Sequence, residues 1–101
     1  MIDAYEDQEG RAAATLRKLV DFRDKRVLEI GCGQGRLTRR YAGETAWVTA
    51  IDPAADKIAK ARAQTPPALA ARIHYLAAAI ETYEHPPAQP RFDVAIFGYS
   101  L

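Results

Sequence analysis

The 101-residue sequence contains one cysteine, Cys32, and two histidines, His74 and His85. One cysteine cannot form a disulfide within the chain, and neither histidine has a Cys, His, Asp or Glu at metal-ligand spacing, so we expect no metal centre. The formal net charge of +1 gives no electrostatic footprint for nucleic acid or an anionic membrane. No apolar run is long enough to span a bilayer, and residues 1–10 are too acidic and polar for a signal peptide. We therefore expect a cytoplasmic protein.

What is present is a globular composition. Hydrophobic residues make up 49% of the sequence and charged residues 27%, which is typical of a soluble, folded chain rather than a disordered one. At this length we expect one domain with a modest core. We expect residues 1–25 to form an N-terminal helix and lead-in, and residues 26–101 to form an α/β unit.

Apolar runs and amphipathic helical patterns alternate along the chain. Gly43 suits the end of the second helix, and Pro66 and Pro67 stop the third. This alternation predicts an α/β fold with a parallel sheet. The predicted helices are 11–21, 36–42 and 54–63, the predicted strands are 26–30, 47–51, 73–77 and 92–97, and a helical turn at 80–84 precedes an irregular connector at 85–90.

A glycine-rich turn follows the first predicted strand. Gly31, Gly33 and Gly35 alternate with other residues, and a helical pattern begins directly afterwards. Residues without a Cβ allow positive φ angles and let a ligand lie against the backbone. Cys32, inside this turn, is expected to be a small packing residue rather than a nucleophile. The nearby Arg36, Arg39 and Arg40 are expected to form a solvated helix face.

Asp52 ends the second predicted strand, roughly twenty residues beyond the glycine turn. The carboxyl ends of parallel strands meet at one edge of the sheet, so Asp52 and the turn are expected to lie together. A carboxylate has two acceptor oxygens and can hold the two hydroxyls of a ribose. The alternative is that Asp52 only caps the next helix, because Asp52-Pro53 is also a helix-entry pair.

The run Val27-Leu28-Glu29-Ile30-Gly31-Cys32-Gly33-Gln34-Gly35 resembles the first motif of class I S-adenosylmethionine-dependent methyltransferases. The acidic Glu29, two residues before the first glycine, is typical of that family. A nicotinamide-binding G-x-G-x-x-G pattern fits less well, because its third glycine would fall at Arg36. The resemblance implies a doubly wound sheet with strand order 3-2-1-4, of which this chain holds the cofactor-binding half.

The resemblance also implies which residues hold S-adenosylmethionine and its product, S-adenosylhomocysteine. Asp52 matches the second motif, which binds the ribose. Ala79 stands where family members often have an Asp for the adenine amine, so adenine recognition is expected to use backbone groups at Ala79 and Ile80. Phe97, Gly98 and Tyr99 would lie beside the transferred methyl. The full implied cofactor set is Glu29, Gly31, Cys32, Gly33, Gly35, Asp52, Pro53, Ala79, Ile80 and Phe97.

The fourth region reads Phe97-Gly98-Tyr99-Ser100 and lacks the N-P-P-Y-type signature of amino-methylating members. This difference favours a small-molecule methyl acceptor, and no residue is assigned as a catalytic base. Within the family the fourth strand has a fifth beside it, so Val94–Phe97 would here be an open edge. We expect a homodimer, or a missing C-terminal half, to cover it. Two alternatives stay open: a non-catalytic S-adenosylmethionine-binding or assembly module, and a fragment of an NAD-dependent oxidoreductase.

Overall fold

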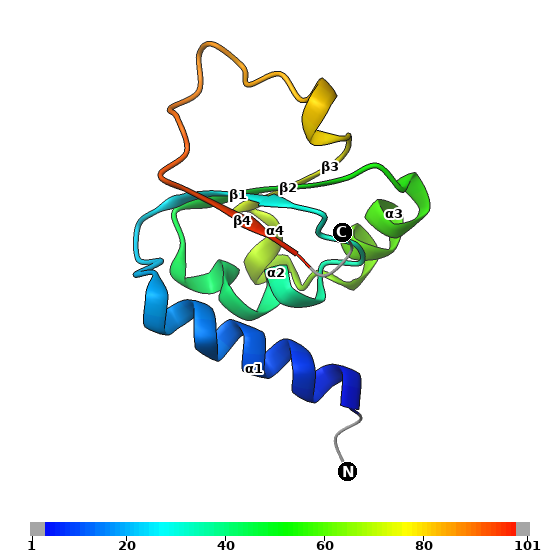
Figure 1. Cartoon of the computed structure of the whole chain (residues 1–101). Coiled ribbons are helices and arrows are strands. Elements are labelled where there is room, and N and C mark those ends of the chain that lie inside the picture. Colours follow the sequence, from blue (N-terminus) through cyan, green and yellow to red (C-terminus); the bar gives the residue numbers. More distant parts are fainter. Residues whose placement is uncertain (1–3, 99–101) are drawn as a thin grey trace.

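The computed structural model describes residues 4–98, and Figure 1 shows the arrangement of their elements. Among these residues, no helix is long and apolar enough to cross a membrane. The elements in chain order are α1 (Ala4–Leu19), β1 (Arg26–Ile30), α2 (Arg36–Tyr41), the 3₁₀ turn η1 (Ala42–Glu44), β2 (Trp47–Asp52), α3 (Ala55–Gln64), α4 (Pro67–Ala70), β3 (Ile73–Ala77), the 3₁₀ turn η2 (Ile80–Thr82) and β4 (Val94–Phe97).

The strands form a parallel sheet in the order β3-β2-β1-β4, which confirms the predicted α/β class with a parallel sheet, flanking helices and this strand order. Ile30 pairs with Ile51 of β2 and with Phe97 of β4, so these strands end at the same level. Asp52 likewise pairs with Ala77 at the end of β3. The carboxyl ends of all the strands therefore form one edge, which we call the carboxyl edge.

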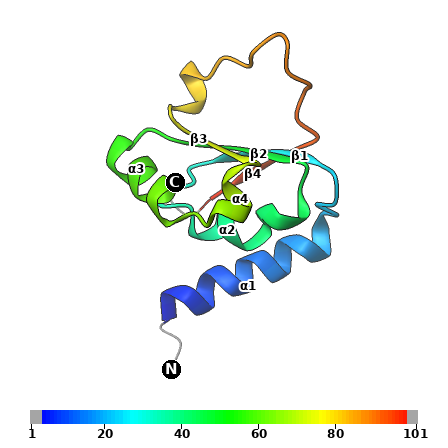
Figure 2. The same cartoon turned by 180° about the vertical axis from the view of Figure 1, so that it is seen from behind.

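The helices pack on one face of the sheet, as the two opposite views in Figures 1 and 2 show. We call it the helix face. Its core holds alternate residues of the strands, such as Val27, Val48 and Ile73, together with Ile58 and Ala61 of α3. A smaller cluster on the other face consists of Leu28, Ile30 and Ile51, covered by Tyr83 and Phe92 of the 83–93 connector.

The structure corrects several predicted boundaries. Helix α1 begins at Ala4, well before the predicted start, because nothing in the acidic lead-in breaks a helix and acidic residues favour a helix start. Gly43 does not cap α2 in the left-handed conformation but lies inside η1. Pro67 begins the short helix α4, since proline fits the first position of a helix. Strand β4 begins only at Val94.

Candidate functional site

Residues 31–35 form a tight loop between β1 and α2, here called the glycine loop. Gly31, Gly33 and Gly35 all have left-handed backbones, with φ of 76°, 55° and 79°. The N–H groups of Gly31 and Cys32 both donate to the Ile51 carbonyl, at 2.8 and 3.0 Å. The Gly35 N–H closes the turn onto the Cys32 carbonyl at 2.9 Å. The alternating glycines therefore create a loop shape that other residues adopt only with strain.

Asp52 joins the end of β2 to this loop. Its Oδ2 accepts a hydrogen bond from the Gly33 N–H at 3.0 Å, and its Oδ1 accepts one from the Ala54 N–H at 2.9 Å. The Ala54 contact is the helix-entry bond considered as an alternative, since Ala54 is the N-cap residue of α3. The Gly33 contact is the proximity predicted from the parallel sheet. A carboxylate has about four lone-pair sites, so both contacts leave acceptor capacity for ligand hydroxyls.

The segments after β3 and β4 meet the same edge. The Ala78 N–H donates to the Asp52 carbonyl at 3.1 Å, and the Gly98 N–H donates to the Ile30 carbonyl at 2.7 Å. A Cβ on Gly98 would collide with the Gly31 carbonyl oxygen. The resemblance implies that Gly98 lies beside the transferred methyl, although Gly98 is not in the implied cofactor set. Its close approach to Gly31 follows from the pairing of β1 with β4.

The Glu29 side chain lies on the helix face of the sheet and is not exposed at the carboxyl edge. The residue is fully buried, and its Oε1 accepts hydrogen bonds from Thr38 Oγ1 and Tyr41 Oη, both at 2.7 Å. Burial and the Glu29 charge raise the pKa of Tyr41 well above its usual value, so the phenol stays protonated as a donor. These bonds fix α2 against β1 immediately behind the glycine loop. In this structure the Glu29 side chain shapes the loop from behind.

Cys32 is also buried, in the main core. Burial, followed by the charges of Glu29 and Asp52, raises the pKa of its thiol far above the usual value. A thiol that stays protonated is a poor nucleophile, which agrees with the predicted packing role.

The other predicted cofactor residues surround Asp52 and the loop at varied depth. Pro53 is exposed and Ala79 is half-buried, whereas Ile80 and Phe97 expose 41% and 66% of their surface. The Ala79 carbonyl accepts hydrogen bonds from the Thr82 N–H and hydroxyl, at 3.1 and 3.2 Å. Tyr99 lies outside the described residues. The predicted set thus divides into a hydrogen-bonded centre, Asp52 with the loop, and an apolar rim.

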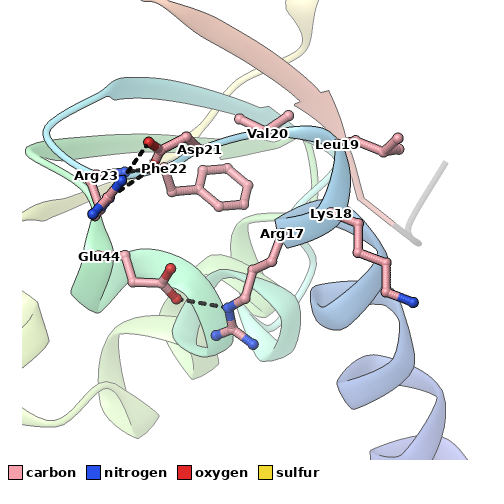
Figure 3. A pocket seen from close by; sticks show the side chains of 8 residues that line it. All are labelled: Arg17, Lys18, Leu19, Val20, Asp21, Phe22, Arg23 and Glu44. Atoms are coloured by element: carbon pink, nitrogen blue, oxygen red, sulfur yellow. Dashed lines mark hydrogen bonds and ion pairs between the residues drawn. The ribbon is translucent and has the colours of Figure 1, made fainter.

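A separate pocket of about 290 Å³ lies where α1 leads into β1, at the opposite end of the strands (Figure 3). Two of the three cations that line it are engaged with neighbouring acids. Arg17 pairs with Glu44 at 2.7 Å, and Arg23 pairs with Asp21 at 3.1 Å. Over residues 4–98, no cluster of three or more His, Cys, Asp or Glu side chains could hold a metal ion. The carboxyl edge is therefore the stronger candidate site.

Comparison with known proteins finds a family match and similar sequences. Residues 27–101 match a family described as methyltransferase domain. The chain is 38% identical over 88 residues to a malonyl-[acyl-carrier protein] O-methyltransferase of Pseudescherichia vulneris, covering 87% of this chain and 32% of that protein. It is 39% identical over 75 residues to the mitochondrial ubiquinone biosynthesis O-methyltransferase of Schizosaccharomyces pombe, covering 72% of this chain and 26% of that protein.

Solved structures agree on the fold. One example is phosphoethanolamine N-methyltransferase 1 of Haemonchus contortus, in complex with phosphoethanolamine and S-adenosylhomocysteine. It superposes with a TM-score of 0.71 at 25% identity, covering 88% of this chain and 18% of that one. This chain thus spans about a third, or less, of the length of the curated relatives it matches.

Proposed function

This chain belongs to the methyltransferase domain family, and we propose that it binds S-adenosylmethionine at the carboxyl edge as the cofactor-binding part of a small-molecule methyltransferase. The observation that carries the proposal is the 3.0 Å hydrogen bond from the Gly33 N–H to Asp52 Oδ2. It places an acceptor-only side chain directly against a loop with three left-handed glycines. Asp52 and the glycine loop each follow a strand in the sequence, and in the structure they lie together at the carboxyl edge.

The residues of this edge suit the parts of such a cofactor. Asp52 offers lone pairs to the ribose hydroxyls, and the glycine loop offers close backbone approach to the amino-acid portion. Because the Ala79 carbonyl is already bonded to Thr82, adenine recognition in this segment would fall to backbone N–H groups. Exposed Ile80 and Phe97 supply apolar surface for the adenine and for the region of the methyl group.

When bound, the cofactor supplies a methyl group on an already activated sulfonium. The contribution of this chain is then binding and orientation, which alone can lower a barrier substantially when the reacting atoms are aligned. The buried bonds of Glu29 hold the base of the loop, and Asp52 ties the loop to β2. No residue of the chain is assigned as a general base.

A small-molecule acceptor is supported by two observations. The residues after β4 lack the N-P-P-Y-type signature of amino-methylating members. The names of the relatives also include an enzyme of ubiquinone biosynthesis and one acting on a malonyl group. These names do not identify the acceptor of this chain. A cytoplasmic location remains a prediction from composition.

For the partner we propose a second copy, or a further half of the fold, along β4. Among residues 4–98, β4 pairs only with β1, and its outer edge has no strand beside it. Its residues Ala95 and Phe97 are exposed on the face away from the helices. Pairing along this strand would satisfy the backbone and cover the apolar side chains together.

Calorimetric titration with S-adenosylmethionine, S-adenosylhomocysteine and NAD⁺ separates the candidate functions. We expect the methyl donor and its product to bind and NAD⁺ not to bind. Binding of NAD⁺ alone would instead support an oxidoreductase fragment. Binding of the methyl donor, without methyl transfer to any acceptor by the full-length protein, would support a non-catalytic module. Absence of binding by all three ligands would contradict the proposed site.

A further inference from the structure

The back of the glycine loop rests on two side chains from other elements. At Gly35, an added Cβ would lie 2.7 Å from Tyr75 Oη of β3 and 3.0 Å from Arg39 Nη1 of α2. Gly35 also has a left-handed backbone, with φ of 79°. The last glycine of the motif is therefore required by contacts behind the loop as well as by its backbone conformation.

The Arg39 side chain is hydrogen-bonded to the glycine loop and does not extend freely into solvent. It is half-buried, and its Nη1 donates to the Gln34 carbonyl at 2.7 Å. Its Nη2 donates to Gln64 Oε1 of α3 at 3.3 Å, and its backbone N–H donates to the Gly35 carbonyl at 3.0 Å. The prediction that Arg39 belongs to a solvated helix face is wrong. The reason is that the guanidinium reaches back one helical turn to the loop carbonyl.

Tyr75 is held in place by a short chain of hydrogen-bonding groups at the end of α3. Thr65 Oγ1 lies 2.6 Å from the Ala61 carbonyl oxygen and 2.9 Å from Tyr75 Oη, and its hydroxyl donates toward these two acceptors. Burial raises the pKa of Tyr75, while Thr65 and Arg39 oppose that shift. The end of α3 thereby fixes the phenol against Gly35.

We infer that Arg39 and Tyr75 are positioning residues, which hold the glycine loop in its cofactor-binding shape before the cofactor arrives. This inference rests on the proposed function of the loop. Neither residue has to touch the cofactor, because both act on the loop from behind. A loop that is already ordered binds more tightly, since ordering it on binding costs free energy.

The chain allows a direct readout of loop shape. It contains six glycines, three of them in the loop, so selective ¹⁵N-glycine labelling gives a spectrum with few amide signals. We expect Arg39→Met to shift or broaden the Gly33 and Gly35 signals without ligand, and to leave Gly43 unchanged. The matched control is Arg40→Met, the next residue on the same helix. Its guanidinium lies near Gly10, so this variant should move the Gly10 signal instead.

Affinity for S-adenosylhomocysteine provides the second readout. Arg39→Met should weaken binding about tenfold, as expected when a charge-assisted hydrogen bond is lost, and Arg40→Met should leave it unchanged. Thr65→Val should release the Tyr75 phenol and weaken binding, whereas Thr65→Ser keeps the hydroxyl and should restore it. This rescue distinguishes positioning of the phenol from simple packing, and it stays informative if Arg39→Met does not fold.

These experiments distinguish failure of the positioning role from failure of the proposed function. Unchanged loop glycine signals in both Arg39→Met and Thr65→Val would overturn the positioning role. So would unchanged affinity in those variants when the native chain binds S-adenosylhomocysteine. If the native chain binds no S-adenosylhomocysteine, the proposed function fails, and the ligand-free glycine spectra still decide whether these residues shape the loop.

Discussion

The two faces of the sheet differ in how completely they are covered. On the helix face, Val27, Val48 and Ala50 are fully buried under α2 and α3, and Phe22 stacks on Tyr41 with ring centroids 4.7 Å apart. On the other face, Leu28, Ile30 and Ile51 are covered only by the 83–93 connector. A hollow of about 610 Å³ lies there between Leu28 and the connector residues Tyr83, His85 and Phe92.

This difference shows where the fold gains its stability. Parallel sheets are normally buried on both faces. The helix face meets that requirement within residues 4–98 and includes the residues behind the glycine loop. Within the connector, His85 packs edge-on against Phe92 at 4.9 Å and hydrogen-bonds with the Gln89 and Pro90 carbonyls. We therefore expect the helix face and the carboxyl edge to tolerate substitution poorly, and the other face to tolerate it well.

The largest difference in stability between the two faces of the sheet is expected at two neighbouring residues of β4. Ile96 faces the helix side and is 8% exposed, whereas Phe97 faces the other side and is 66% exposed. Ile96→Ala should lower the free energy of unfolding by about 2–4 kcal/mol through lost burial and a new cavity. Phe97→Ala should change it by about 0.5 kcal/mol or less. Urea denaturation of both variants measures this, and equal losses would show that the two faces are equally covered.

The second test concerns the contact between Gly35 of the glycine loop and the Tyr75 hydroxyl on the helix face. Gly35→Ala should destabilise the fold by about 1–3 kcal/mol, because alanine is strained at this φ and its Cβ meets the Tyr75 hydroxyl. Tyr75→Phe removes that hydroxyl, so the double variant should be more stable than the sum of the single changes predicts. Denaturation of the four proteins measures the coupling. Strict additivity would mean that the phenol does not press on Gly35.

The third test asks whether a second copy of the chain pairs along the unpaired edge of β4, beside the less covered face of the sheet. Ala95→Lys places a charge on the exposed side of the strand without entering the helix-side core. If the native chain self-associates there, this variant should weaken the dimer at least about tenfold, or roughly 1.4 kcal/mol. Light scattering after size exclusion measures the mass of each. A native chain that stays monomeric at high concentration, with no response to the substitution, would contradict pairing through this edge.

The exposed ion pair near the pocket of Figure 3 gives the smallest effect. The Arg23 side chain lowers the pKa of Asp21 to about 2. A lowered pKa stabilises the fold above the unfolded value, and the contribution is lost as pH falls toward about 2. Arg23→Ala should raise the Asp21 pKa toward its usual range in an NMR titration, although the backbone N–H of residue 23 still donates to Asp21 Oδ1, and stability near neutral pH should hardly change. A large loss of stability at neutral pH would contradict the expectation that this exposed ion pair contributes almost nothing to the free energy of unfolding.

Local sequence signals predicted most of the fold and the centre of the site. The glycine spacing and the strand-ending Asp52 act through nearest neighbours and through the geometry of parallel strands, so their positions could be read directly. The roles of Arg39 and Tyr75 behind the loop could not be predicted, whereas the resemblance already places Gly98 beside the transferred methyl. Arg39 turns back from its helix to the Gln34 carbonyl, and the Tyr75 hydroxyl lies against Gly35 from another strand. Both roles depend on side-chain packing, which a residue pattern does not determine.

We propose that Asp52 and the glycine loop hold S-adenosylmethionine, and titration calorimetry with S-adenosylhomocysteine tests this proposal most directly. Asp52→Ala removes charge-assisted hydrogen bonds, so affinity should fall by about 1.5–3 kcal/mol, roughly tenfold to a hundredfold. Asp52→Asn keeps one acceptor oxygen and should recover part of the loss. Circular dichroism shows whether each variant remains folded. A folded Asp52→Ala protein that binds S-adenosylhomocysteine as tightly as the native chain would contradict the account.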